Sequence, residues 1–312
     1  MSAPIITTDG LTKRFGAFTA VEDVALRVEP GTIFAFLGAN GSGKSTTIRM
    51  LIGLLRPTSG TAVVDGIDVV HHPRRVRDHI GYMGQHVSLY QGLTVRENVE
   101  FYGGLHGLDR PRLERRWGTL AERFGLAEAA GARSEEIPAA IRQRAGLALS
   151  MLHEPRLLFL DEPTAGVDVR SRSLFWEVIG EEARRGVSVF VTTHFLEEVD
   201  ACDRVSFIEA GRIIAEGTPD DLRRRCAAPY RIEVEAPARE VARLQDAAAA
   251  AGLPTTSTDG GLRALVPALD PAYLHALQAL ADAEPALRIH VREPPMGEVF
   301  ERLLGAAGKV AQ

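Results

Sequence analysis

The sequence predicts an α/β fold, in which buried strands alternate with helices. Two observations carry this prediction. Strand-like and helix-like segments alternate from residue 1 to about 220, and Gly-rich turns such as Glu209–Arg212 separate them. After residue 229 the order becomes strand, helix, two strands, helix and strand, which is the split βαβ arrangement of a small α+β domain.

Length and composition limit the choices further. The chain has 312 residues, enough for one large domain or two, and its 45% hydrophobic and 25% charged content is that of a soluble globular protein. The net charge of −5 gives no sign of a nucleic-acid partner. Cys202 and Cys226 lack metal-binding spacing, so we expect free thiols. We expect neither a signal segment nor a membrane-spanning run of roughly 18–20 apolar residues.

The expected elements divide the chain into two domains, residues 1–226 and 229–304. In the first, residues about 88–150 are mostly helical in pattern and form an insert, in which Thr94–Glu97 predicts a capping-box helix start. The second closes with a short amphipathic helix, Met296–Leu304, and we expect it to serve packing or dimerisation. The expected strands are Ile5–Thr8, Ala25–Val28, Thr61–Val64, Leu157–Leu160, Val187–Thr192, Arg204–Glu209, Tyr230–Glu235, Pro254–Thr258, Leu262–Val266 and Leu287–Val291; the tail helices are Ala238–Ala251 and Pro271–Ala283.

A glycine-rich segment joins the buried strand Thr32–Leu37 to the helix Thr46–Gly53. Its G-x-x-x-x-G-K-S spacing is that of the phosphate-binding loop of nucleoside triphosphatases. Glycines let backbone N–H groups point at oxyanions, and the helix start adds partial positive charge. Lys44 can reach the outer phosphates and Ser45 can ligate Mg²⁺. The expected nucleotide contacts are therefore Gly38, Ala39, Asn40, Gly41, Ser42, Gly43, Lys44, Ser45 and Thr46.

Two carboxylates end a second apolar strand, Leu157–Leu160. Ligands of open α/β sheets bind at the carboxyl ends of strands, so Asp161 is placed to hold Mg²⁺ directly or through water. Glu162 can polarise the water that attacks a γ-phosphate. An acidic pair alone would more often be a solvated loop; the complete phosphate loop upstream favours the catalytic interpretation.

With both motifs in place, residues about 5–220 resemble the ATP-binding subunit of ABC transporters. The resemblance implies a P-loop NTPase core of the ABC ATPase type with a helical insert, and it implies ATP and Mg²⁺ as ligands. Leu11–Gly16 looks like the family's aromatic loop, which implies that Phe15 stacks on adenine. Glu293–Phe300 resembles the closing segment of drug-, antibiotic- and polysaccharide-exporter ATPases.

Further roles are carried over by position. Gln85 matches the family's glutamine loop, which touches Mg²⁺ and the attacking water and senses the membrane partner. His194, at the end of a strand, matches the switch histidine that contacts the γ-phosphate, and Ala165–Asp168 matches the loop that meets the other subunit. The resemblance implies a separate transmembrane permease, no nucleic acid, and a peripheral position on the cytoplasmic face of the cell membrane.

The resemblance breaks at the family's signature, L-S-G-G-Q or S-G-G-M. This chain has Ile137-Pro138-Ala139-Ala140-Ile141, so proline replaces the serine and alanines replace both glycines. In relatives this element grips ATP bound to the other subunit. Each lost hydrogen bond to a charged group is worth roughly 1.5–3 kcal/mol, so losing two weakens the closed site by roughly 100-fold or more, unless backbone shifts preserve some contact.

A broken signature beside an intact catalytic half-site favours a heterodimer with a second ATPase subunit over a homodimer. Two alternatives stay open. A regulatory nucleotide-binding subunit with little hydrolysis is favoured by the damaged signature and opposed by Glu162 and His194. A soluble ABC ATPase without a transport role usually has two ATPase domains or long coiled coils, and this chain has one phosphate loop and no heptad array.

Overall fold

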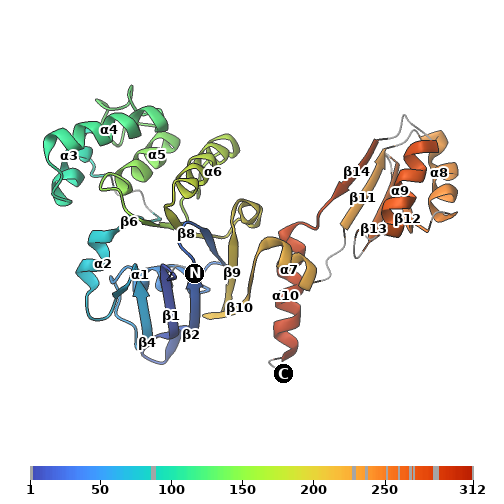
Figure 1. The fold of residues 1–312 in the computed structure, drawn as a ribbon, viewed down its shortest axis with the longest axis horizontal. Coiled ribbons are helices and arrows are strands. Elements are labelled where there is room, and N and C mark those ends of the chain that lie inside the picture. The colour runs from blue at the N-terminus through green and yellow to red at the C-terminus, as the bar shows by residue number, and fades with distance from the viewer. Residues whose placement is uncertain are drawn as a thin grey trace. The chain divides into compact units, whose positions relative to one another are not determined.

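The chain forms two compact units, Met1–Pro219 and Asp220–Gln312, which are described separately. Figure 1 shows the elements of each in a computed structural model. The structure describes residues 3–85, 89–226, 230–235, 238–250, 252–258, 261–266, 269, 271–283 and 288–310. The α/β class predicted from the sequence is confirmed.

A four-stranded antiparallel sheet opens the first unit, in the order β2-β1-β4-β5. Its strands are longer than the sequence predicted, and the segment interpreted as an aromatic loop is the end of β1. The register shifts between Thr8 and Leu11, and such bulges hide the alternation of polar and apolar residues that marks a strand. The strands are β1 (Ile6–Phe15), β2 (Phe18–Val28), β4 (Ser59–Val64) and β5 (Ile67–Asp68).

A six-stranded sheet forms the centre of this unit, in the order β10-β9-β3-β8-β7-β6. All its strands run parallel except β10. Buried Phe34, Phe159 and Phe190 meet at centroid distances of 5.5 Å across β3, β7 and β8. The strands are β3 (Ile33–Leu37), β6 (Ile80–Met83), β7 (Leu157–Asp161), β8 (Ser188–Thr193), β9 (Arg204–Glu209) and β10 (Arg212–Gly217).

Three helices of the expected insert, α3, α4 and α5, gather on one side of the first unit (Figure 1). The predicted capping box at Thr94 and Glu97 is present at the start of α3. On α4, Leu113, Trp117 and Leu120 are buried at helical spacing. The helices of this unit and its 3₁₀ helix η1 are α1 (Lys44–Leu51), α2 (Pro73–His79), α3 (Val95–Leu105), α4 (Arg110–Phe124), α5 (Ala139–Ser150), α6 (Val169–Arg184) and η1 (Leu196–Ala201). The short helix α7 (Pro219–Arg225) starts at the last residue of this unit and otherwise belongs to the second.

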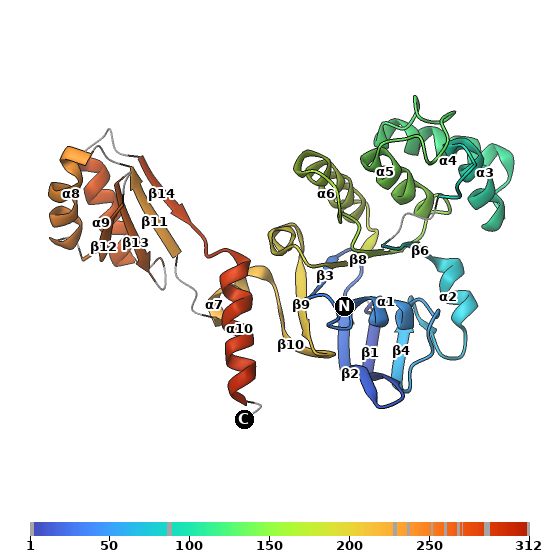
Figure 2. The ribbon, with the colours of Figure 1, turned by 180° about the vertical axis from the view of Figure 1, so that it is seen from behind.

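The second unit has the predicted strand–helix–strand–strand–helix–strand order. Its antiparallel sheet runs β12-β13-β11-β14, and Figure 2 shows α8 and α9 together on one face of it. The last helix continues past the predicted end at Leu304; residues 251 and 287 of the predicted elements lie outside the described residues. The elements are β11 (Tyr230–Glu235), α8 (Ala238–Ala250), β12 (Thr255–Thr258), β13 (Gly261–Val266), α9 (Pro271–Ala283), β14 (Arg288–Arg292) and α10 (Met296–Val310).

None of the helices over these described ranges combines the length and apolar composition that a membrane crossing requires.

Two histidine rings stack beside a cavity of about 160 Å³ in the first unit. His106, at the end of α3, and His153, after α5, lie 3.7 Å apart between ring centroids, with planes 4° apart. His153 Nε2 donates to the carbonyl oxygen of Ile80 at 3.0 Å, which fixes the neutral tautomer. Burial, and then the neighbouring His106, lower the pKa of His153 to about 4.

This depressed pKa predicts an acid-sensitive fold. Above pH 6.5 His153 is neutral in both states. As the pH falls from 6.5 towards 4, the unfolded chain takes up a proton that the folded chain refuses, so stability is lost. We expect the free energy of unfolding to fall over this window by on the order of 2 kcal/mol more in the wild type than in His153→Gln, which does not titrate. Urea titrations of both proteins at pH 6.5 and at pH 4 measure this difference. An equal fall in the free energy of unfolding in both proteins would contradict the prediction.

Candidate functional site

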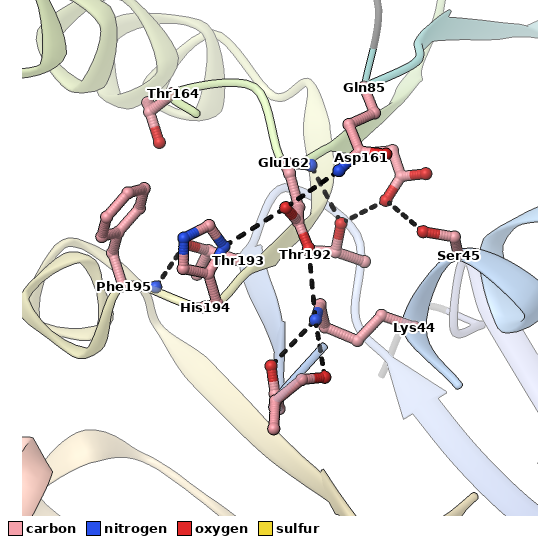
Figure 3. A network of polar contacts seen from close by, with 12 residues as sticks. Lys44, Ser45, Gln85, Asp161, Glu162, Thr164, Thr192, Thr193, His194 and Phe195 are labelled. Carbon is pink, nitrogen blue, oxygen red and sulfur yellow. Dashed lines mark hydrogen bonds and ion pairs between the residues drawn. The ribbon is translucent and has the colours of Figure 1, made fainter. Parts of the chain in front are cut away.

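The site lies where three parallel strands of the central sheet end at the same level. Strand β8 lies between β3 and β7, with Leu37 paired to Thr193 and Thr192 paired to Asp161. The glycine loop, His194 and Glu162 therefore leave the sheet side by side. Figure 3 shows their side chains converging. The predicted neighbourhood of the two motifs is thus present, at the carboxyl edge where α/β sheets bind ligands.

The glycine loop wraps tightly before α1. A Cβ atom at Gly38 would lie 2.3 Å from the carbonyl oxygen of Ile208, and one at Gly43 would lie 2.7 Å from that of Ala20. Gly43 also has φ of 111°, which side chains rarely adopt. Packing therefore requires glycine at both positions, and backbone conformation adds to that requirement at Gly43. The loop leaves Ala39, Asn40 and Gly41 exposed and Ser45 and Thr46 half-buried.

Ser42 lies within the same loop but is buried. Its Oγ has no hydrogen-bond partner among the described residues. Since buried polar atoms are normally satisfied, this unpaired hydroxyl is an uncommon feature of the loop.

Lys44 is the cation of the site and only 4% exposed. Its Nζ donates to the carbonyl oxygens of Gly38 at 2.8 Å and Ala39 at 3.1 Å, and it lies 3.2 Å from Glu162 Oε1. A buried ammonium requires such partners because isolated charges are costly away from water.

Asp161 connects the two motifs. Its Oδ1 accepts from Ser45 Oγ at 3.2 Å and from Thr192 Oγ1 at 2.6 Å. The sequence analysis missed Thr192; its position one strand away, directly before Thr193 and His194, was the available signal. Carboxylate and hydroxyl oxygens thus lie together at the start of α1.

Glu162 is the hub of the site. Its backbone has φ of 50°, an uncommon left-handed conformation, and its N–H is held by Thr192 through Oγ1 at 3.0 Å and the carbonyl oxygen at 3.1 Å. Its Oε2 accepts from Gln85 Nε2 at 3.3 Å and lies 3.2 Å from His194 Nδ1. The structure therefore gathers Lys44, Gln85 and His194 around one carboxylate (Figure 3).

Phe15 stands apart from these polar contacts. It is the last residue of β1 and is 49% exposed. Lys13 Nζ lies 5.1 Å from the centre of its ring. An exposed aromatic ring at this position is available to stack on a planar ligand.

The altered signature begins α5. Pro138 is its N-cap, with φ of −55° and ψ of 150°, and no side chain caps the helix. The first helical bond runs from the Arg142 N–H to the Pro138 carbonyl oxygen at 2.9 Å. Proline is therefore accommodated at this helix start, as the residue directly before the first helical position.

Comparison with known proteins gives one consistent result. Residues 21–165 match the family model described as "ABC transporter", and residues 143–200 match a model described as "AAA domain, putative AbiEii toxin, Type IV TA system". The chain is 46% identical over 223 residues to "Probable multidrug ABC transporter ATP-binding protein YbhF" of Escherichia coli, covering 72% of this chain but only 39% of that protein.

Another relative matches along its whole length. "Daunorubicin resistance ATP-binding protein DrrA3" of Streptomyces coeruleorubidus is 39% identical over 317 residues, covering 100% of this chain and 99% of that protein. A solved structure described as "Structure of ATP binding subunit of ABC transporter" superposes with a TM-score of 0.66 and 30% identity, over 71% of this chain and 92% of that one.

Proposed function

Because the chain belongs to the ATP-binding proteins of ABC transporters, we propose that it binds ATP with Mg²⁺ and hydrolyses it to power export through a separate membrane permease. The observation that carries this proposal is the convergence of Lys44, Asp161, Glu162 and His194 at one sheet edge. Relatives named for multidrug and daunorubicin resistance support the direction of transport.

Phosphate binding is assigned to the glycine loop and Lys44. The buried ammonium already faces inward toward two carbonyls and Glu162. A triphosphate offers it more negative charge than a single carboxylate does, so we expect Lys44 to exchange Glu162 for phosphate oxygens. Backbone N–H groups at the start of α1 would also donate hydrogen bonds to the phosphates, and Phe15 would stack on the adenine.

The oxygen donors near α1 suit Mg²⁺. Ser45 Oγ and Asp161 Oδ1 lie 3.2 Å apart, and Gln85 adds an amide nearby. Mg²⁺ prefers a few such oxygens completed by water and phosphate. Within the described ranges no group of three His, Cys, Asp or Glu side chains suits a metal ion, which agrees with a metal held largely by its nucleotide. When bound, Mg²⁺ would neutralise phosphate charge.

Hydrolysis is assigned to Glu162 and His194. Once released from Lys44, Glu162 Oε1 can accept a proton from water, while Oε2 stays within reach of Gln85 and His194. His194 Nδ1, 3.2 Å from that carboxylate, would orient the carboxylate and contact the γ-phosphate. Positioning of this kind is the main contribution of proteins to phosphoryl transfer.

We further propose a peripheral position at the cytoplasmic face of the membrane, with the permease docked near Gln85 and the helical insert. Exposed apolar side chains support this surface. Leu54 lines the cavity with Tyr102, and Leu105 is exposed at the end of α3. Clustered exposed apolar residues mark interaction sites.

The partner ATPase subunit is inferred from the signature. Pro138, Ala139 and Ala140 would serve ATP on the other subunit, whereas Lys44 and Glu162 serve this chain's own ATP. We propose a heterodimer, in which a partner with an intact signature completes this chain's site. The damaged signature also favours a second candidate, a regulatory subunit with little hydrolysis.

The first prediction concerns nucleotide binding. Lys44→Ala should weaken retention of labelled ATP in magnesium buffer by about 10-fold or more, because charge-assisted bonds are lost. Arg49→Ala, which removes an exposed cation from the same helix, should bind as the wild type does. Glu162→Gln should retain ATP but lose turnover. Undiminished turnover in Glu162→Gln would favour the regulatory candidate, and undiminished ATP retention in Lys44→Ala would exclude the proposed site.

The second prediction concerns the assembly. Purification of the chain with its transport partners should yield two different ATPase subunits, counted by native mass spectrometry. Two identical copies that turn over ATP briskly would contradict the heterodimer.

The third prediction concerns docking. Leu54→Asp and Leu105→Asp should reduce co-fractionation with membranes that contain the permease, because each places a charge in an apolar contact. ATP retention should be unchanged. Leu174→Asp places the same charge at an exposed leucine of α6 and is the matched control. Normal co-fractionation of both variants would exclude this surface.

A further inference from the structure

A buried polar contact beside the candidate site has no part in the nucleotide binding or hydrolysis proposed above. Thr164 Oγ1 donates to Glu198 Oε1 at 2.5 Å. Thr164 follows Glu162 by two residues, and Glu198 lies on η1, four residues after His194. The two residues are 1% and 3% exposed. This contact therefore joins the segments that carry the two catalytic groups.

An aromatic contact reinforces the same junction. The Phe195 ring lies against the His194 ring, with centroids 4.1 Å apart, and the Arg172 guanidinium lies 3.9 Å over Phe195. Arg172 Nε is 3.7 Å from Glu198 Oε1. Figure 3 shows Thr164 and Phe195 on the side of His194 that faces away from Lys44. The imidazole thus packs at a tilt of 36° against Phe195. Phe195 in turn lies under the guanidinium of Arg172, which also lies 3.4 Å from Glu197 Oε2.

The burial of Glu198 argues against a mere packing role. Among the described residues its Oε2 is buried without a hydrogen-bond partner, and so is Arg172 Nε. A buried carboxylate with few partners is costly. An apolar side chain would fill the same space at lower cost, so the carboxylate is explained better by what it holds than by the stability it adds.

The pairing of β7 and β8 shows which two segments the Glu198 carboxylate holds together. The two segments leave neighbouring strands at the paired residues Asp161 and Thr192, and they meet again at Glu162 and His194, 3.2 Å apart. The His194 side chain is 35% exposed, so this single contact leaves its orientation open. The Thr164–Glu198 bond adds a second link between the two segments, beyond the contact of Glu162 with His194.

We propose that Thr164, Arg172 and Glu198 form a clamp that positions His194 against Glu162 during ATP hydrolysis. The clamp rests on the proposed function, since it acts through the two proposed catalytic groups. Its members are positioning residues, which act through His194 and Glu162 and not on the nucleotide itself. It also ties His194 to the loop Ala165–Asp168, the segment expected to meet the partner subunit, so arrival of the partner there would be transmitted to His194.

The test compares Thr164→Val, which keeps the shape but loses the hydroxyl, with Thr164→Ser, which keeps the hydroxyl. The full chain is assayed with its transport partners. Thr164→Val removes a bond to a charged group, and Glu198→Gln removes the charge that the bond and Arg172 share; each should lower kcat by about 10-fold or more. The KM for ATP and the retention of labelled ATP should stay within about twofold. Thr164→Ser should restore most of kcat.

Two further variants separate positioning from stability. Ser206→Ala removes another hydroxyl–carboxylate bond of the first unit, Ser206 Oγ to Glu216 Oε2 at 2.6 Å, and should leave kcat unchanged. Arg172→Gln removes the stacked guanidinium from a partly exposed position and should lower kcat while the protein stays folded. It keeps the test valid if Thr164→Val fails to fold.

The outcomes distinguish the two proposals. Wild-type protein that neither retains nor hydrolyses ATP refutes the proposed function. Normal wild-type turnover with unchanged kcat in both Thr164→Val and Arg172→Gln overturns the clamp alone. A loss of kcat that Thr164→Ser does not rescue, or an equal loss in Ser206→Ala, also overturns it, because either result indicates general destabilisation.

Discussion

The register of three parallel strands is the constraint on which the site depends. Strand β8 lies between β3 and β7, and the pairs Leu37–Thr193 and Thr192–Asp161 set all three strand ends at one level. A slip by one residue would reverse the facing of every side chain beyond it. The phenylalanines buried across these strands make such a slip costly. Core packing and site geometry are thus fixed by the same pairing.

That register concentrates charge at a buried edge. Lys44, Asp161 and Glu162 are all less than a tenth exposed, so their interactions are stronger than at a surface. Glu162 has two opposing demands: its Oε1 neutralises Lys44, while its proposed role requires a carboxylate free to accept a proton. The proposed phosphate binding at Lys44 would resolve the conflict, because the cation would then have another anion. In the proposed function, binding and catalysis are linked through this one exchange of partners.

The sequence was sufficient for the parts of the site that lie within one motif. The sequence placed the glycine loop Gly38–Ser45, the acidic pair and His194 each at the end of a strand. The structure has them at the ends of β3, β7 and β8. Contacts between motifs were not predictable. Thr192 contacts Asp161, and Thr164 contacts Glu198, because β8 pairs with β7 in the register that sets Thr192 beside Asp161. Strand lengths in the first sheet were underestimated because bulges interrupt the alternation.

The altered signature favours helix formation at the start of α5 and removes polar groups from the same place. Proline has φ near the value that a helix start requires, and alanine favours a helix by roughly 1 kcal/mol over glycine. Pro138, Ala139 and Ala140 therefore favour the helix more than the family's serine and glycines would. The same changes add Cβ atoms and remove a hydroxyl at the start of α5, the position proposed to meet a second subunit's ATP. They leave unchanged the segments that carry Lys44 and Glu162, so the proposed loss of contact with a partner's nucleotide is compatible with an unaltered candidate site in this chain.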